Sequence, residues 1–193
     1  MSRIESAFCR SGPWRAVTRR VLPWALQGLE PVGEVLEIGA GSGAMAAAVL
    51  TTHPETRITV TDYDDAMVAA ATQRLAPFGA RATARQADAN ALPFGDNTFD
   101  TVLTFIMLHH TVSWEQVLAE ATRILTPGGT LIGYDLLSSR PTRLLHRLEG
   151  APHRLIRRGE LAPVLYQLPI RNSRVRENPL LVRFTATKQA KPS

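Results

Sequence analysis

The chain has 193 residues, of which 45% are hydrophobic and 20% are charged. That composition suits one domain with its own core and excludes collagen-like and disordered chains. Cys9 is the only cysteine, which excludes a disulfide framework and a cysteine-based metal centre and favours a reducing compartment. Because no segment reads as a signal peptide or a membrane span, we expect a soluble, cytoplasmic protein.

The net charge of +5 is unevenly distributed along the chain. Residues 140–193 carry 12 basic and 3 acidic side chains, whereas residues 1–139 carry 10 basic and 14 acidic ones. A basic region of this kind can serve an anionic substrate, a membrane surface or nucleic acid, or it can simply be a solvated face. Aromatic side chains do not interleave with these arginines as a platform for single-stranded nucleic acid would require.

Apolar residues at three- and four-residue spacings predict a helix over residues 13–28, which Pro23 could interrupt. After it, short apolar or β-branched runs alternate with helical runs. The predicted strands cover residues 35–38, 57–61, 81–86, 99–107 and 130–134, and the predicted helices cover residues 42–53, 66–76 and 114–125. Residues 127–129, Pro-Gly-Gly, predict a turn before the fifth strand. The alternation is typical of a parallel, doubly wound sheet with helices on both faces.

The end of the chain follows a different pattern. Residues 143–148 and 160–168 are predicted to be helical, and two strands are predicted at residues 170–176 and 180–188. Strands this close in sequence cannot host a crossover helix, so they must pair antiparallel or lie apart. We therefore expect an α/β fold with a Rossmann-like, doubly wound, seven-stranded sheet that is mostly parallel and ends in an antiparallel strand.

The first predicted strand leads into a glycine-rich loop, V-L-E-I-G-A-G-S-G, over residues 35–43. Glycines at 39, 41 and 43 allow the backbone to approach a ligand closely, because no Cβ intervenes. A loop between a strand end and a helix N-terminus is where an α/β sheet holds a small molecule. Glu37 in the strand could contact that ligand or could be a buried carboxylate satisfied by helix amides. We favour the ligand role, because burying a charge is costly.

Five further motifs follow the glycine loop in a fixed order. They are V-T-D-Y-D at 60–64, D-A-N-A-L-P-F at 88–94, F-D-T-V-L at 99–103 with His109-His110 beyond, L-T-P-G-G-T-L at 125–131, and L-V-R-F-T-A-T-K at 181–188. With these motifs the chain resembles the class I S-adenosylmethionine-dependent methyltransferases, in the small-molecule branch related to ubiquinone and menaquinone biosynthesis methyltransferases. The resemblance covers roughly residues 30–188.

The resemblance implies S-adenosyl-L-methionine as the cofactor, S-adenosyl-L-homocysteine as its product, and no metal. Glu37 and the Thr104 carbonyl would lie near the ligand's ammonium, Asp62 would accept the ribose hydroxyls, Tyr63 would lie against the adenine, and Asp88 would receive the adenine amino group. The full expected set of cofactor-binding residues is Glu37, Gly39, Ala40, Gly41, Gly43, Asp62, Tyr63, Asp88, Ala89 and Thr104.

Other polar residues in the same motifs are expected to be structural. Asp62 could instead cap the helix at 66–76, but Asp64 fits that N-cap position better. Asp100 is expected to make a contact at the start of the fourth strand.

Methyl transfer is an in-line displacement, so the protein mainly aligns the reacting groups, and a general base helps when the nucleophile is a hydroxyl. His110, and less so His109, are the candidate bases after the fourth strand, although both could instead be structural or helix-capping histidines. The residues expected to contact the acceptor are Trp14, Tyr134, Asp135 and Arg143.

We expect a single methyltransferase domain over residues 1–193. Its expected parts are a helical cap at 1–30, a cofactor-binding core at 31–135, a helical cover over the substrate at 136–160, and a last helix with the terminal strand pair at 161–188. The cover is rich in arginine, which favours an acceptor carrying a carboxylate or phosphate, or a lipid-like acceptor at an anionic surface. Peripheral membrane contact and a monomer or homodimer both stay open.

Three alternatives compete with a small-molecule methyltransferase. A nicotinamide dehydrogenase would space its glycines as G-x-G-x-x-G, whereas here they fall as G-x-G-x-G. An RNA methyltransferase is encouraged by the sequence pI near 10.1, but residues 104–107, Thr-Phe-Ile-Met, lack the Asn/Asp-Pro-Pro-aromatic motif of base-amino methyltransferases. A protein that binds S-adenosylmethionine without catalysis would keep the same motifs. We expect a small-molecule acceptor rather than nucleic acid.

Overall fold

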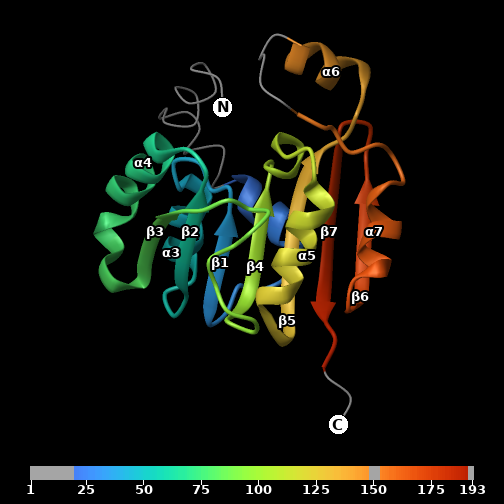
Figure 1. Ribbon diagram of the computed structural model, residues 1–193. Coiled ribbons are helices and arrows are strands. Elements are labelled where there is room, and N and C mark those ends of the chain that lie inside the picture. Colours follow the sequence, from blue (N-terminus) through green and yellow to red (C-terminus); the bar gives the residue numbers. More distant parts are fainter. Residues whose placement is uncertain (1–19, 148–152, 191–193) are drawn as a thin grey trace.

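A mixed seven-stranded sheet runs through the middle of the computed structural model (Figure 1). The structure describes residues 20–147 and 153–190. The strand order is β3-β2-β1-β4-β5-β7-β6. Strands β1 to β5 pair in parallel, whereas β7 is antiparallel to both β5 and β6. This arrangement confirms the predicted fold class, including the antiparallel strand pair at the end of the chain.

The elements follow the predicted alternation closely. The strands are β1 Glu34–Ile38, β2 Arg57–Asp62, β3 Ala82–Gln86, β4 Phe99–Phe105, β5 Leu125–Leu136, β6 Ile170–Glu177 and β7 Leu181–Lys188. The helices are α3 Ala44–Thr52, α4 Asp65–Leu75, α5 Trp114–Ile124, α6 Arg140–Arg147 and α7 Leu161–Gln167, with the 3-10 turns η1 Ala76–Arg81 and η2 Leu108–His110. Residues 20–26 are also helical, without a break at Pro23, and residues 13–19 of the predicted first helix lie outside the described range.

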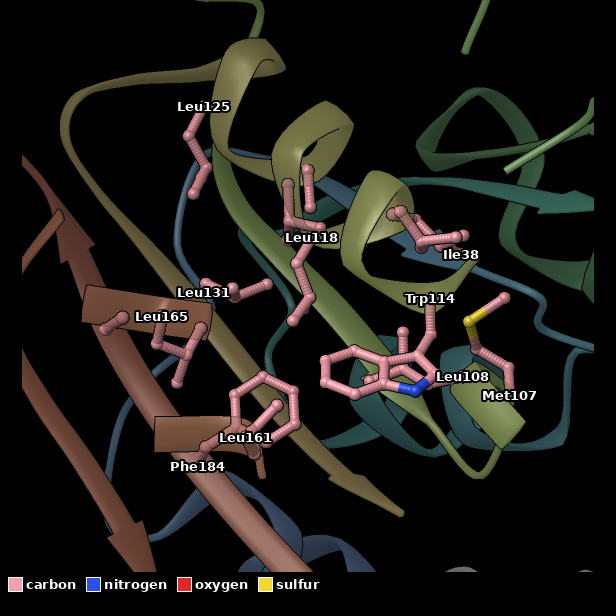
Figure 2. Packing of buried hydrophobic residues seen from close by; sticks show 14 of the residues in the cluster. Ile38, Met107, Leu108, Trp114, Leu118, Leu125, Leu131, Leu161, Leu165 and Phe184 are labelled. Carbon is pink, nitrogen blue, oxygen red and sulfur yellow. The ribbon is translucent and has the colours of Figure 1, made fainter. Parts of the chain in front are cut away.

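Alternate residues of the strands enter two separate cores. Residues 20–26, α3 and α4 pack on one face of the sheet, against Val35, Leu103 and Ile132. Helices α5 and α7 pack on the other face, where Trp114 and Phe184 are fully buried (Figure 2). Because neighbouring residues of one strand face opposite cores, the central strands β1 and β4 are apolar on both sides, as the β-rich runs in the sequence indicated.

Two strand boundaries differ from the prediction. Strand β4 ends at Phe105 instead of residue 107, because Ile106 takes a left-handed conformation with φ of 52° that no strand can continue. Strand β5 begins at Leu125, and the predicted turn at residues 127–129 is an irregularity within it. The register with β4 jumps there from Phe99–Leu125 to Thr101–Thr130.

The remaining differences are small. Helix α6 begins at Arg140, three residues before the predicted start of that helix. The side chain of Asp64 accepts a hydrogen bond from the amide of Ala66 at 2.8 Å, which confirms the predicted N-cap of α4. Asp100 accepts a hydrogen bond from the Glu34 amide at 3.0 Å, as expected for a structural contact. Within the described ranges, no helix is both long and apolar enough to span a bilayer.

Candidate functional site

The glycine loop leaves β1 and turns into α3 through three left-handed glycines, with φ of 65° at Gly39, 54° at Gly41 and 73° at Gly43. A Cβ at Gly39 would lie 2.7 Å from the Cβ of Met107, so the loop crosses directly over the segment that follows β4. A Cβ at Gly41 would meet no atom within 4 Å. The backbone at Gly41 is therefore open on one side, as a ligand cradle requires.

Hydrogen bonds tie this loop to the carboxyl end of β2. The amide of Ala40 donates to the carbonyl of Thr61 at 2.9 Å, and the amide of Gly41 donates to Asp62 Oδ2 at 2.8 Å. The other oxygen, Asp62 Oδ1, accepts from the amide of Asp64 at 3.0 Å. Burial raises the pKa of Asp62, and these amide donors oppose that rise. Each oxygen keeps lone-pair capacity for a hydroxyl donor.

Glu37 is the most deeply buried carboxylate beside the loop, with 2% of its surface exposed. It accepts a hydrogen bond from the backbone of Ala46 in the first turn of α3, while its Oε2 has no partner. Burial raises the pKa of Glu37 to about 8. Helix α3 therefore meets one side of the carboxyl group, while the other side lacks a partner, and the ligand role of Glu37 stays a prediction. A cationic group arriving at Oε2 would offset part of the cost of burial.

The neighbouring strands place further polar groups at this edge. Thr104 lies in register between Ile38 of β1 and Gly133 of β5, is 1% exposed, and its Oγ1 has no hydrogen-bond partner. Tyr134 is also buried, and its pKa is raised by burial first and then by the charges of Glu37 and Asp135. The carboxyl edge of the sheet beside the glycine loop therefore carries buried acidic and hydroxyl groups.

The ends of β2 and β3 meet because Asp62 pairs in register with Gln86. Tyr63 follows β2 with 75% of its surface exposed. Asp88 follows β3 and is exposed, and its Oδ1 accepts from both nitrogens of Asn90, at 2.8 and 2.9 Å. Ala89 beside it is half-buried against the core. The structure therefore brings the residues expected at the adenine to one corner of the sheet.

A buried histidine–aspartate pair lies under η2. The Nδ1 of His109 is 2.5 Å from Asp135 Oδ1, and Asp135 Oδ2 accepts from the amide of Leu108 at 2.7 Å. Both side chains are almost fully buried, at 1% exposed for His109 and 0% for Asp135. The predicted acceptor contact at Asp135 is wrong in this arrangement, because its oxygens are bonded within the protein. Although the sequence named both residues, it gave no sign that they pair.

His110 lies closer to the surface than His109. It is half-buried, and its ring centroid is 4.1 Å from that of His109. The preceding bend was not expected, since Ile106 is a β-branched residue in a left-handed conformation and its amide donates to the carbonyl of Tyr134 at 2.9 Å. Nothing in the local sequence signals that bend, which turns the chain from β4 toward η2.

The arginine-rich segment at residues 136–160, which was predicted to cover the substrate, contains arginines that form salt bridges within the protein. Arg154 binds Glu115 at 2.6 Å and Glu160 at 2.6 Å, and its guanidinium lies 5.1 Å above the ring of Trp114. Arg158 pairs with Glu177 at 3.4 Å. These two arginines attach the cover to α5 and β6, which removes them from the set expected to bind an anionic acceptor.

Other arginines of this segment, including the predicted acceptor residue Arg143, are exposed. Arg143 is exposed and donates to Ser138 Oγ at 3.2 Å, while Arg140 and Arg157 are exposed as well. Trp14 lies outside the described residues. Among the described residues, no group of three or more His, Cys, Asp or Glu side chains could hold a metal ion.

Comparison with known proteins agrees with this geometry. A family model described as a methyltransferase domain matches residues 35–129. Ubiquinone/menaquinone biosynthesis C-methyltransferases from Desulfotalea psychrophila and Geobacter sulfurreducens are 36% identical over 103 residues and 31% identical over 138 residues, which is 53% and 70% of this chain. Those alignments cover 41% and 52% of the relatives, so the chain spans about half the length of the curated relatives it matches.

Solved structures show the same fold at lower identity. Phosphoethanolamine N-methyltransferase 2 from Haemonchus contortus, solved with phosphomonomethylethanolamine and S-adenosylhomocysteine, superposes with a TM-score of 0.77 at 15% identity, over 91% of this chain and 53% of that one. The region matched by the family model contains the glycine loop, Asp62, Asp88 and Thr104. The chain therefore belongs to the class I S-adenosylmethionine-dependent methyltransferases.

Proposed function

We propose that this protein transfers a methyl group from S-adenosylmethionine to a small-molecule acceptor. The observation that carries the proposal is the open side of the glycine loop at the carboxyl end of β2, a place that we call the crevice. There the Gly41 amide is tied to Asp62 at 2.8 Å, open space lies beside Gly41, and a buried Glu37 oxygen has no partner. A nucleoside with a cationic amino acid arm matches this set of a backbone cradle, a diol acceptor and a buried carboxylate.

Each group of the donor has a proposed partner. Glu37 and Thr104 would hold the ammonium end, since both side chains are buried at that edge and each has an oxygen without a partner. The backbone of residues 39–43 would contact the methionine and ribose portions, and Asp62 would accept the ribose hydroxyls. Tyr63, Asp88 and Ala89 would contact the adenine. Asp62 suits its role because Gly41 and Asp64 already fix its orientation.

The bound donor supplies a methyl carbon that its positively charged sulfur has already activated. The protein's own contribution is then alignment and the exclusion of water. We propose that His110 contacts the acceptor and can take a proton from it, because it is the more exposed of the two histidines. His109 and Asp135 would position the turn that carries His110. Asp135 accepts from both His109 and the Leu108 amide, which fixes η2 from beneath.

For the acceptor we propose a quinone-type ring that is methylated at carbon. Support comes from the names of the relatives, which are ubiquinone/menaquinone biosynthesis C-methyltransferases and, in Thermus thermophilus, a demethylmenaquinone methyltransferase that is 30% identical over 119 residues. Such an acceptor is lipid-like, so contact with a membrane surface is part of this proposal. Tyr134 would form the floor of the acceptor site, and Arg143 of the cover would lie at its rim.

Calorimetric titration tests the donor part of the proposal. S-adenosylmethionine and S-adenosylhomocysteine should bind saturably, NADH should not bind, and Asp62→Ala should weaken both nucleosides by roughly ten- to a hundredfold. Binding of NADH in place of the two nucleosides would overturn it. The acceptor part is tested by following release of S-adenosylhomocysteine with demethylated quinols and, separately, with RNA. Turnover on RNA alone would replace the quinone-type acceptor.

A further inference from the structure

A hollow lies on the face of the sheet that carries residues 20–26, away from the crevice. It has a volume of about 720 Å³, a size typical of small-molecule sites. Its floor is formed by β5, β7 and β6, which lie side by side at one end of the sheet (Figure 1). Its wall is formed by residues 23–29. We call it the arginine groove, after its lining residues Arg174, Arg176 and Arg183.

The register of the two antiparallel strands concentrates positive charge in this groove. Arg176 of β6 stands directly opposite Arg183 of β7, and Arg174 stands opposite Thr185. Alternation along each strand places these side chains on one face, while Val182 and Phe184 enter the core on the other. Like charges directly opposite each other destabilise a strand pair. The arrangement therefore costs stability unless an anion neutralises it.

Among the described residues, no carboxylate lines the groove to provide that neutralisation. Glu177, the nearest acidic residue in sequence, instead pairs with Arg158 at 3.4 Å and accepts from the Gly159 amide at 2.8 Å. Arg174 and Arg176 have exposed side chains. The positive charge of the groove is thus left for a group from outside the described part of the chain.

One of the three guanidinium groups is held in place before any ligand arrives. Arg183 donates to the carbonyl of Trp24 at 3.1 Å, and its guanidinium carbon lies 4.9 Å from the centroid of the Trp24 ring. Gln27 fastens the same wall to β7 by donating to the carbonyl of Phe184 at 3.1 Å. A guanidinium fixed in this way loses little freedom on binding, which favours tight binding of an oxyanion.

The rest of the lining indicates which anion fits. Hydroxyl and amide side chains supplement the arginines, and they come from Gln27, Thr130, Asn172, Ser173, Thr185 and Thr187. Asn172 is at a bulge with φ of 53°, where the pairing of β6 shifts between Arg171 and Arg174. A lining of this kind suits an oxyanion with several acceptors and disfavours an apolar acceptor. Of the lining residues that the structure describes, Trp24 alone is aromatic, and it already stacks on Arg183, so these residues offer successive bases no platform.

We propose that the arginine groove is a binding site for a small ligand carrying phosphate groups, separate from the methyl-donor crevice. The phosphates bridge Arg174, Arg176 and Arg183, and the hydroxyl side chains of β5 and β7 complete the contacts. This site does not depend on methyl transfer, because none of its lining residues belongs to the proposed donor set.

The test uses inorganic tripolyphosphate as the probe in calorimetric titrations of the full chain. We expect saturable binding by the wild type and binding weakened by at least about tenfold in Arg174→Gln/Arg176→Gln. The matched control is Arg140→Gln/Arg157→Gln, which removes the same charge from two exposed arginines that do not line the groove. The control should change binding by less than about twofold. Circular dichroism verifies that both variants fold, and S-adenosylmethionine titration verifies that the donor crevice is unchanged.

Two further arms identify the source of the phosphate. Vesicles of phosphatidylcholine with and without phosphatidylglycerol are sedimented with each variant. Loss of both tripolyphosphate and anionic-vesicle binding in the groove variant points to a lipid headgroup, and loss of tripolyphosphate binding alone points to a soluble ligand. The proposal is overturned if the wild type does not bind tripolyphosphate, or if both double variants weaken it equally. It is also overturned if single-stranded RNA binds through the same arginines and tripolyphosphate cannot displace it.

Discussion

The two proposed sites of this molecule hold charge in opposite ways. At the methyl-donor crevice the charged groups are carboxylates, and backbone amides meet them. Gly41 and Asp64 donate to Asp62, and Ala46 donates to Glu37. In the arginine groove the charged groups are guanidiniums, and across the strand pair Arg176 faces another arginine, Arg183. Charge in the crevice is therefore largely satisfied by the fold, whereas charge in the groove awaits a ligand.

The difference follows from where each site lies in the sheet. The crevice is at the carboxyl ends of parallel strands, where loops and a helix N-terminus offer unpaired amides. The groove lies across the middle of an antiparallel pair, where the ladder already consumes the backbone donors and acceptors. Away from the bulge at Asn172, side chains therefore supply most of the polar groups. Whether a charged side chain has partners should therefore decide whether its removal lowers or raises the free energy of unfolding, and by how much.

Removing a fully paired buried carboxylate should have the largest effect. Asp135→Ala leaves His109 and the Leu108 amide without their partner in a site that is almost inaccessible to water. We expect the free energy of unfolding to fall by about 4 kcal/mol, measured by urea denaturation. Glu55→Ala, at an exposed carboxylate in the loop before β2, is the control and should change it by less than about 0.5 kcal/mol. A similar small loss at both positions would contradict the stabilising role of the pair.

Removing the partly unpaired Glu37 charge should raise the free energy of unfolding at high pH. The pKa of Glu37 is raised from 4.5 to about 8 in the folded chain, so the folded state binds the extra proton between these values. Stability from this group is fully present below about pH 4.5 and is lost as pH rises through 8. Without bound donor, the wild type should lose about 4 kcal/mol between pH 5 and 9, and Glu37→Gln should lose much less.

Urea denaturation at several pH values measures this slope, and S-adenosylmethionine titration of the same variant separates stability from binding. Glu37→Gln should weaken donor binding although it stabilises the free protein at pH 9, because the glutamine cannot pair with an ammonium. Equal pH slopes in the two proteins would show that Glu37 is ionised in the folded state throughout this range.

The glycine loop offers a matched pair of substitutions within the crevice. Gly39→Ala should lower the free energy of unfolding by about 2 kcal/mol, since the left-handed φ of 65° is strained for alanine and the new Cβ meets Met107 at 2.7 Å. Gly41→Ala carries the same kind of strain but meets no atom, so about 1 kcal/mol is expected. The affinity for the methyl donor should fall more in Gly41→Ala than in Gly39→Ala, because a methyl group at Gly41 enters the open cradle. Equal effects on stability at both positions would contradict the contact with Met107.

The sequence predicted the features of these regions that depend on neighbouring residues and missed those that depend on tertiary contacts. The glycine loop, the Asp64 cap and the antiparallel end strands each follow from neighbouring residues, and the structure confirms the cap and the strands. The left-handed Ile106 could not be predicted, because a β-branched residue adopts that conformation only under tertiary constraint. The engagement of Arg154 with Glu115, 39 positions away, was likewise invisible.

The arginine groove is the clearest case of a feature that only register reveals. The excess of basic residues over 140–193 was evident, but only the arginines of residues 136–160 were linked to an anionic ligand. Arg174 and Arg183 could have faced either side of the sheet, because shifting the pairing by one residue moves every side chain to the other face. The bulge between Arg171 and Arg174 sets that choice for Arg174 and Arg176, the pairing of β7 with β5 sets it for Arg183, and no residue pattern predicted the bulge.

The smallest expected change in stability tests most directly whether the charges of the arginine groove, unlike those of the crevice, lack partners within the protein. Arg176→Gln removes the cross-strand repulsion with Arg183 and should raise the free energy of unfolding by about 0.5 kcal/mol at low salt, with a smaller gain at high salt. Arg174→Gln, opposite the neutral Thr185, should leave it nearly unchanged. Adding tripolyphosphate should reverse the order, because the wild type then gains binding energy that the variant lacks. A loss of stability in Arg176→Gln without any ligand would mean that this charge is already neutralised within the protein, and the groove would then resemble the crevice.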